Sequence, residues 1–366
     1  MNKLHCRKFL PYWLTLCLTA WLTVGVSVSS VLAAGATQNT SNAAEHNAGQ
    51  DVGKPFTISD KYGPGDEFMS TRLLGAVRLQ ASKVKGEKPR ELSGLAWDSD
   101  QQILIAISDD GFIVHLVPTF SDGFLTGLKL LAVNPLEDQF GQALSGKQAD
   151  AEGLVGHNMS NGVLADSFVS ISFEAEPRII DYSLEGKFLR AHPLPERLRE
   201  LDNYADDNQE LETLTKHPGY GMLTAPERPL RDSNTEFFSI YGLDGSIWHY
   251  PPLDKKYSAL VGMETMPSGN LLVLERRYAS LLQPIIFAVR ELSLSSPALG
   301  EAKLVREVLQ FSSSDGWKID NFESLTHHEN GRYFMISDDN ESIFQKTLLI
   351  YFEINGDTSL NENQKN

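Results

Sequence analysis

A short pattern that recurs five times is the feature of the chain that most restricts its fold. In each copy, a small residue precedes Leu or Met inside an apolar run, and a second apolar run follows after a turn. The copies are Ser93-Gly-Leu, Glu152-Gly-Leu, Glu212-Thr-Leu, Glu264-Thr-Met and Glu323-Ser-Leu. They are 59, 60, 52 and 59 residues apart. A regular period of this size predicts a propeller or another array of repeats.

The runs within each period have the character of β-strands. Apolar and polar residues alternate, and Gly, Pro, Asn and Asp interrupt the runs, which excludes helical repeats. In the first period, four strands can be placed at about 92–97, 103–108, 112–117 and 127–133. We therefore predict an all-β fold, a β-propeller of four-stranded antiparallel blades. The copies give about five blades, and the longer insertions leave a sixth blade open.

The ends of the repeat region suggest how the ring closes. The last copy provides only three strands, whereas residues 71–79 precede the first copy and have no blade of their own. Pairing this N-terminal strand with the last blade would close the propeller and cover its edges. Residues 194–207 form the one segment with helical character, between the second and third copies.

The N-terminus has the pattern of a secretory signal peptide. Basic residues precede an apolar run that ends near Val31, and Ala34-Gly-Ala follows as a cleavage site, so residues 1–36 are predicted to be the signal. The alternative is an uncleaved membrane anchor, because the apolar run is about long enough to span a bilayer. We expect cleavage, a secreted or periplasmic protein, and no membrane attachment afterwards.

The remaining chain divides into three parts. Residues 37–67 are polar at their start and are predicted to be a disordered linker, and residues 355–366 are predicted to be a flexible tail. Residues 68–354 form the predicted propeller domain. Nothing inside this domain resembles a linker, and we expect a monomer.

Composition excludes several classes of function. Both cysteines, Cys6 and Cys17, lie in the predicted signal, so a mature chain has no thiolate nucleophile and no cysteine-ligated metal. The formal net charge is −16, which excludes nucleic acid as a partner because phosphate backbones need clustered Lys and Arg. Divalent cations and neutral molecules suit such a surface better.

Carboxylates recur at equivalent points of the repeats. Second strands end in Asp109, Glu174, Glu227, Glu275 and Asp338, and four of the five copies begin with Glu, whereas Ser93 occupies that point in the first. Inner strands of a propeller run along its axis, so these acids should meet at one face. Converging carboxylates repel one another unless a cation intervenes. Ca²⁺ or Mg²⁺ would relieve the repulsion, and the alternative is that the acids cap turns and pair with arginines.

Other catalytic motifs are absent from the sequence. There is no G-x-S-x-G, no H-E-x-x-H, no P-loop and no G-x-G-x-x-G. His327 and His328 are neighbours on a predicted strand and would face opposite sides, so they cannot chelate one ion together.

Several motifs together resemble the phytase-like family, also called the esterase-like activity of phytase family. The resemblance extends from about Leu73 to Ile354. It rests on LSGLAWD at 92–98, SDDG at 108–111, DAEGL at 150–154, FEAEPRI at 173–179, DYSLEGK at 181–187, NQELETL at 208–214, PERPLRD at 226–232, LERR at 274–277, NFESL at 321–325 and SDDN at 337–340. The signatures of histidine acid phosphatases and cysteine phytases are missing. The likeness to β-propeller phytases, which use clustered calcium ions, is one of architecture.

The resemblance implies an exported β-propeller, and the family name suggests hydrolysis of phosphate or other esters. Our leading hypothesis is a calcium-dependent hydrolase of a small-molecule ester or phosphate ester. Arg178 and Arg276 would bind the substrate's anionic oxygens. One alternative is a non-catalytic propeller that binds a ligand, a glycan or a partner protein around structural calcium, and another is a lactonase-like hydrolase. The predicted metal ligands are Asp109, Glu152, Glu174, Glu212, Glu275, Glu323 and Asp338.

Overall fold

The computed structural model describes residues 49–80, 91–206, 210–280, 283–339 and 345–357. Contacts divide the chain into two compact units, 1–44 and 45–366, and every described residue belongs to the second. The predicted signal peptide therefore lies outside the described residues. The described part is all β apart from four 3-10 turns, which confirms the predicted fold class. It contains no helix long and apolar enough to cross a membrane.

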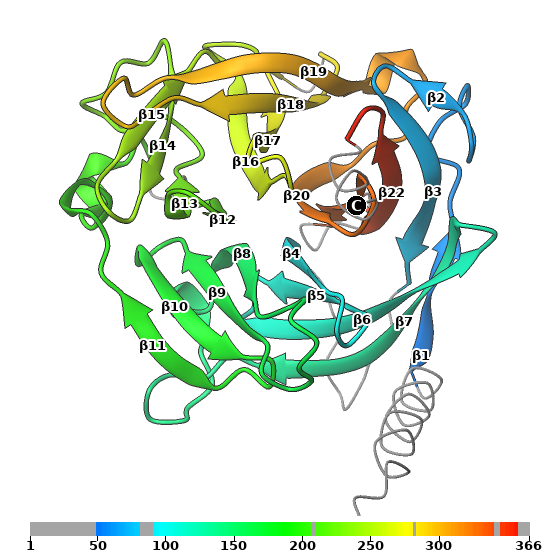
Figure 1. Cartoon of the computed structure of the whole chain (residues 1–366), viewed down its shortest axis with the longest axis horizontal. Coiled ribbons are helices and arrows are strands. Elements are labelled where there is room, and N and C mark those ends of the chain that lie inside the picture. Colours follow the sequence, from blue (N-terminus) through cyan, green and yellow to red (C-terminus); the bar gives the residue numbers. More distant parts are fainter. Residues whose placement is uncertain (1–48, 81–90, 207–209, 281–282, 340–344, 358–366) are drawn as a thin grey trace, which may run out of the picture. The chain divides into compact units, whose positions relative to one another are not determined.

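Three sheets each consist of four consecutive antiparallel strands (Figure 1). The second repeat forms β8 (Ala151–His157), β9 (Phe168–Phe173), β10 (Arg178–Ser183) and β11 (Phe188–His192). The third forms β12 (Thr213–His217), β13 (Gly221–Ala225), β14 (Phe238–Gly242) and β15 (Ile247–Tyr250). The fourth forms β16 (Ser258–Thr265), β17 (Leu271–Arg277), β18 (Ile286–Leu294) and β19 (Ala302–Ser312).

The first and last repeats share a ten-stranded sheet. The first forms β4 (Leu92–Asp98), β5 (Ile103–Ser108), β6 (Phe112–Ser121) and β7 (Phe124–Pro135). The last forms β20 (Asn321–His327), β21 (Arg332–Asp338) and β22 (Leu348–Ile354). Three N-terminal strands complete the sheet: β1 (Gln50–Pro55), β2 (Glu67–Phe68) and β3 (Thr71–Leu79).

The N-terminal strands close the arrangement as the sequence predicted. β3 pairs with β22, so it becomes the fourth strand of the last repeat. β1 then pairs with both β3 and β7 and joins the last repeat to the first. The inner strands β4, β8, β12, β16 and β20 contact one another in that order, and β20 contacts β4. They therefore surround a common axis, as the propeller prediction requires (Figure 1).

The glycine of the first two copies is a steric requirement of these inner strands. A Cβ atom added to Gly94 would lie 2.7 Å from the Leu154 Cβ atom, and one added to Gly153 would lie 2.6 Å from the Leu214 nitrogen. Neighbouring inner strands thus approach too closely for a larger side chain. The residue before this point is bulged out of register in β4, β8, β16 and β20.

The bulge corrects the predicted alignment of the fourth copy. In β16 the register shifts between Leu260 and Gly262, so Val261 is the counterpart of Glu152 and Glu323. Glu264, which the sequence analysis placed at this point, lies three residues further along, toward the other end of β16. The triplet Glu264-Thr-Met has residue types like those of the other copies but a different place in the strand. The position equivalent to Gly94 and Gly153 is occupied by Gly262.

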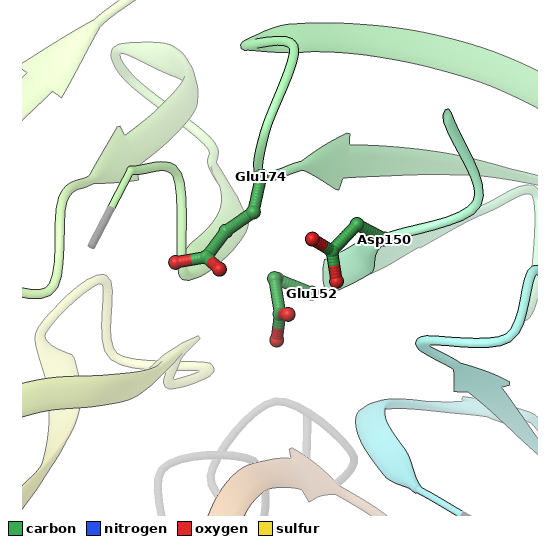
Figure 2. Close-up of side chains that lie close together, drawn as sticks. All are labelled: Asp150, Glu152 and Glu174. Carbon is green, nitrogen blue, oxygen red and sulfur yellow. The ribbon is translucent and has the colours of Figure 1, made fainter. Parts of the chain in front are cut away.

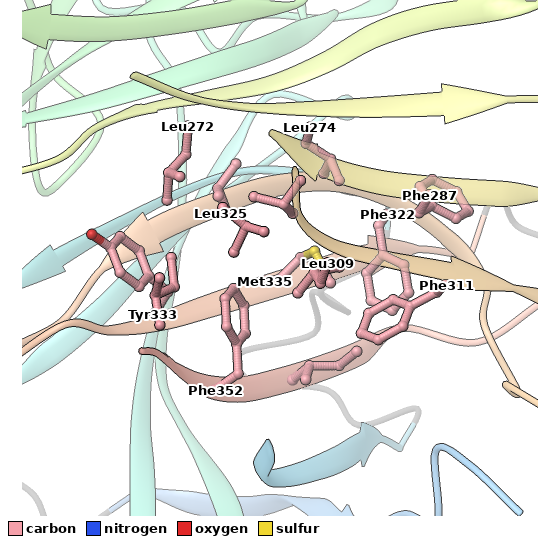
Figure 3. Close-up of a cluster of buried hydrophobic side chains, with 14 of the residues drawn as sticks. Leu272, Leu274, Phe287, Leu309, Phe311, Phe322, Leu325, Tyr333, Met335 and Phe352 are labelled. Atoms are coloured by element: carbon pink, nitrogen blue, oxygen red, sulfur yellow. The ribbon is translucent and has the colours of Figure 1, made fainter. Parts of the chain in front are cut away.

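The packing explains why the central strands are continuously apolar. In β5, Ile103, Ile105 and Ile107 pack against the second repeat, whereas Leu104 and Ala106 pack against the last repeat. Successive side chains of a strand face opposite sides, and here both sides are buried. A further cluster between the fourth and last repeats is rich in aromatic rings, including Phe287, Phe322 and Phe352 (Figure 3).

The fold begins earlier and ends later than the sequence predicted. Residues 50–55, assigned to the linker, form β1, and Val52 is buried there. β1 has one buried apolar residue, so no alternation revealed it. At the other end, the Tyr333 hydroxyl donates a hydrogen bond of 2.6 Å to Asp357 Oδ2, within the predicted tail. Residues 37–48 and 358–366 lie outside the described part.

The predicted helical segment 194–207 contains 3-10 turns instead. One covers Glu196–Leu198 and the next Leu201–Asn203. The other two 3-10 turns are Gly146–Gln148 and Ser313–Asp315. Leu198 and Tyr204 are buried, which anchors the segment against the third repeat.

Candidate metal centre

Two sets of equivalent residues meet where the inner strands begin. The first set occupies the bulge position of four repeats and, in the third, the residue just before β12: Ser93, Glu152, Glu212, Val261 and Glu323. The second set lies at or just beyond the end of the neighbouring strand: Asp109, Glu174, Glu227, Arg276 and Asp338. We call these two sets the acidic end. Seven of the ten residues are acids, and the fourth repeat alone contributes Val and Arg.

Three carboxylates of the second repeat are close enough to share one ion. Asp150, Glu152 and Glu174 each offer an oxygen, and these oxygens lie within 4.8 Å of one another. Figure 2 shows the three side chains grouped together at the start of β8 and the end of β9. Glu152 and Glu174 are buried, with 8% and 2% of their surface exposed. This is the geometry that a cation with oxygen ligands requires.

The carboxylates of neighbouring repeats interact directly. Burial raises the pKa of Glu174 to about 7, although hydrogen bonds from the Glu212 carboxyl and the Glu210 amide oppose the rise. Burial also raises the pKa of Glu212, and repulsion from Glu174 and Glu227 adds to the effect. Burial and mutual repulsion thus disfavour the charged form of both Glu174 and Glu212.

The same repulsion extends across the axis. Burial, followed by repulsion from Asp109, Glu212 and Glu174, raises the pKa of Glu152. Burial and repulsion from Glu323 raise the pKa of Asp109, while the Ser93 hydroxyl donates a hydrogen bond that opposes it. Ser93 thus supplies a donor at the point where three other repeats supply an acid.

Arg276 is the cation that the fourth repeat places among these acids. Its Nη2 atom donates to Glu227 Oε1 at 2.8 Å, and its Nη1 atom lies 3.8 Å from Glu323 Oε1. Asn321 bridges the two, because it accepts from Arg276 and donates to Glu323. Burial would lower the pKa of Arg276, but attraction to Glu227 and Glu323 raises it. Burial and the Asp338 charge still raise the pKa of Glu323 to about 8.

Arg178 lies beside the carboxylates of the second repeat. Its guanidinium stacks 3.9 Å from the centre of the Phe173 ring and donates to the carbonyl oxygens of Gln148 and Glu176. Its charge opposes the rise in the pKa of Asp150 that burial causes. Arg178 is therefore held near Asp150, away from Arg276.

Glu275 lies away from the acidic end, contrary to the sequence prediction. Its Oε1 atom accepts from Arg290 Nη1 at 2.7 Å, and its Oε2 atom accepts from the Leu253 amide at 2.7 Å. Adjacent residues of a strand point to opposite faces. Because Arg276 reaches the acidic end, Glu275 turns into a buried ion pair inside the fourth repeat.

The structure brings six of the seven predicted ligands to the acidic end: Asp109, Glu152, Glu174, Glu212, Glu323 and Asp338. Asp150 and Glu227 join them and were missing from the predicted set. Glu227 stood at a strand end in the sequence and could have been included on that signal. Asp150 lies before its strand, where no periodicity applies, and only the DAEGL motif contained it.

The chain was compared with family models, curated proteins and solved structures. A family model described as Phytase-like, esterase-like activity of phytase, matches residues 89–341. No match was found among curated proteins. Among solved structures, one titled "Structure of U3-55K" is similar with a TM-score of 0.35 and 9% sequence identity, over 79% of this chain and 99% of that chain.

Proposed function

Because the chain belongs to the phytase-like family, we propose that its acidic end binds Ca²⁺ and hydrolyses phosphate esters or related esters of small molecules. The observation that carries the proposal is the trio Asp150, Glu152 and Glu174, whose oxygens lie within 4.8 Å of one another. Carboxylate oxygens are the ligands that Ca²⁺ prefers, and the surrounding acids provide the negative charge that attracts it. The donor set therefore fits this ion.

The residues of the acidic end have separate roles in this proposal. The trio holds the ion, which when bound polarises a phosphoryl or carbonyl oxygen. Arg276 binds an anionic oxygen of the substrate, since its charge faces the same space as the acids. Glu212, whose pKa burial raises, acts as the general acid that protonates the leaving group.

The proposal includes the setting in which the protein acts. The signal-like N-terminus supports action outside the cytoplasm, and calcium is more available there than inside cells. We propose that the protein works as a monomer on a soluble ester. Size-exclusion chromatography with light scattering measures the mass of the particle, and a dimer would contradict this part.

The test compares wild type with Glu152→Gln in binding and in turnover. Calcium should raise the melting temperature of wild type, by mass action on the folded state. Purified protein is then assayed with a phosphomonoester, a phosphodiester, a carboxylic ester and a lactone, in calcium and in EGTA. We expect turnover of one ester that EGTA abolishes, and a loss of at least about tenfold in Glu152→Gln.

The matched control is Glu307→Gln, an exposed carboxylate on the outer strand β19. It should behave as wild type in both measurements. Turnover that persists in EGTA would contradict the role of calcium. A calcium-dependent melting temperature without turnover of any ester would contradict the hydrolase and leave a calcium-binding propeller.

A further inference from the structure

The opposite end of the inner strands forms a second cavity. Three residues beyond the bulge, the five repeats contribute Ala96, Val155, Thr215, Glu264 and Thr326, and all five line a cavity of about 440 Å³. The next residue of each inner strand lines it as well. We call this cavity the distal pocket. At about 3.3 Å per residue, its first ring lies about 10 Å along the strands from the acidic end.

The walls of the distal pocket combine apolar and polar side chains in about equal measure. Leu95, Leu154, Met159 and Met266 line it together with Trp97. Leu95, Leu154 and Met266 are otherwise buried in the clusters between repeats. A ligand of this pocket can therefore place an apolar part against these side chains.

Lys216 is the one cationic side chain among the lining residues. Its Nζ atom lies 3.5 Å from His157 Nδ1. Because an ammonium group can only donate, His157 must accept at Nδ1 and carry its proton on Nε2. That proton is donated to Ser170 Oγ at 2.8 Å, and Ser170 in turn donates to Asp181 Oδ1 at 2.5 Å. A buried chain of hydrogen bonds thus fixes the acceptor that holds Lys216.

Glu264 lines the distal pocket from the fourth repeat and adds an acidic group to it. Its Oε1 atom accepts from the His327 amide at 2.9 Å. Burial raises the pKa of Glu264 to about 7, so the carboxyl group carries a proton in much of the population near neutral pH. The Nε2 atom of His327, which also lines the pocket, is buried without a hydrogen-bond partner among the described residues.

We propose that the distal pocket binds a small organic monoanion, a carboxylate on an apolar chain or ring. Lys216 pairs with its charge, and the polar groups of Thr215, Thr265 and Thr326 line the same cavity. Lys216 can balance the single negative charge of a carboxylate. A phosphate dianion carries a second negative charge, which would have no cation and would lie in the same cavity as Glu264. The apolar side chains of the lining, such as Trp97 and Met159, contact the rest of the ligand.

Calorimetric titration with hexanoate tests the proposal on the full chain. We expect binding by wild type, and at least about tenfold weaker binding by Lys216→Gln, the loss typical of one charge-assisted hydrogen bond. Hexylammonium and hexyl phosphate should bind at least about tenfold more weakly than hexanoate. Lys303→Gln, on the outer strand β19, is the matched control and should bind as wild type.

His157 is a positioning residue in this proposal, and two variants separate that role from folding. His157→Phe keeps an aromatic ring to stack on Phe168, whose ring centre lies 4.4 Å away, but removes the acceptor for Lys216. His157→Gln retains an acceptor. We expect the Phe variant to weaken hexanoate binding and the Gln variant to restore part of it, with both variants folded by circular dichroism.

Two results would overturn the proposal: no heat from hexanoate at about 10 mM with wild type, or equal affinity in Lys216→Gln. Binding of hexyl phosphate in preference to hexanoate would also overturn it. Because the distal pocket shares no residue with the acidic end, hexanoate should bind equally in EGTA and in Glu152→Gln. The outcome is thus independent of whether the acidic end binds calcium.

Discussion

Replacing Glu323 by Gln should change how stability depends on pH. Burial and the charge of Asp338 raise the pKa of Glu323 to about 8, against an ordinary value of 4.5. Between these two pH values, the folded protein keeps a proton that the unfolded chain has released. The free energy of unfolding of wild type therefore falls as pH rises from 4.5 to 8 and levels off above. Gln at this position cannot ionise, so the variant lacks this contribution.

The magnitude follows from the size of the shift. A difference of about 3.5 pH units, at 1.36 kcal/mol each, sets an upper bound of about 5 kcal/mol. Glu227 and Arg276 adjust when Glu323 changes, because all three interact. We therefore expect about half of the bound, so that Glu323→Gln loses about 2 to 3 kcal/mol less than wild type between pH 5 and pH 9.

Urea denaturation in EGTA at pH 5, 7 and 9 measures this difference. Glu307→Gln, exposed on β19, serves as the control and should follow wild type. Saturating calcium should flatten the curve of wild type, since a bound cation removes the repulsion that burial imposes. Parallel curves for wild type and Glu323→Gln in EGTA would refute the reasoning, because Glu323 would then titrate alike in both states.

Three further predictions follow from the contacts around the acidic end and the closing strands. Arg276→Gln should lower the free energy of unfolding by about 3 kcal/mol at pH 8, measured by urea denaturation, because it leaves Glu227 without its ion pair. The control Arg277→Gln should lower it by less than about 1 kcal/mol, because its partner Asp254 is partly exposed. Glu275→Gln should cost about 3 kcal/mol through the loss of its pair with Arg290, yet leave the calcium-induced rise in melting temperature unchanged; a smaller rise would place Glu275 in the metal centre. Gly53→Val should lower the melting temperature in differential scanning fluorimetry, since a Cβ atom there would lie 2.5 Å from the Leu128 Cβ atom and push β1 off β7; an unchanged melting temperature would contradict the role of β1 in closure.

Much of the architecture was predictable because it depends on local periodicity. Alternation and turn residues located the strands, and the turn at Asn330-Gly331 forms with positive φ angles of 49° and 73°, as expected for Asn-Gly. The pairing of β3 with β22 followed from counting strands. β1 was missed because its contribution is backbone pairing with neighbours distant in sequence, and a segment with one buried side chain has no pattern.

The errors at the site have a common physical origin. The sequence analysis aligned the fourth copy by the identity of its residues, whereas the fold aligns it by a bulge and by the space available to Gly262. A shift of three residues moved Glu264 to the other end of its strand, and a shift of one turned Glu275 away from the axis. Register errors of this kind reverse the face or the end at which a side chain lies, although the strand itself is correctly placed.

The corrected register also accounts for the asymmetry of the acidic end. If the fourth repeat matched the others, it would add two carboxylates to a space where burial already raises the pKa values of Asp109, Glu152, Glu174, Glu212 and Glu323. Instead it supplies Val261, which is uncharged, and Arg276, which pairs with Glu227 on one side and approaches Glu323 on the other. The Arg276 guanidinium thus lies between acids of the third and last repeats. The trio Asp150, Glu152 and Glu174 belongs to the second repeat. A symmetric ring of acids would attract an ion to its axis, whereas this arrangement favours an ion displaced toward the second repeat. The Arg276 guanidinium, on the side of the third and last repeats, would then favour an anionic ligand.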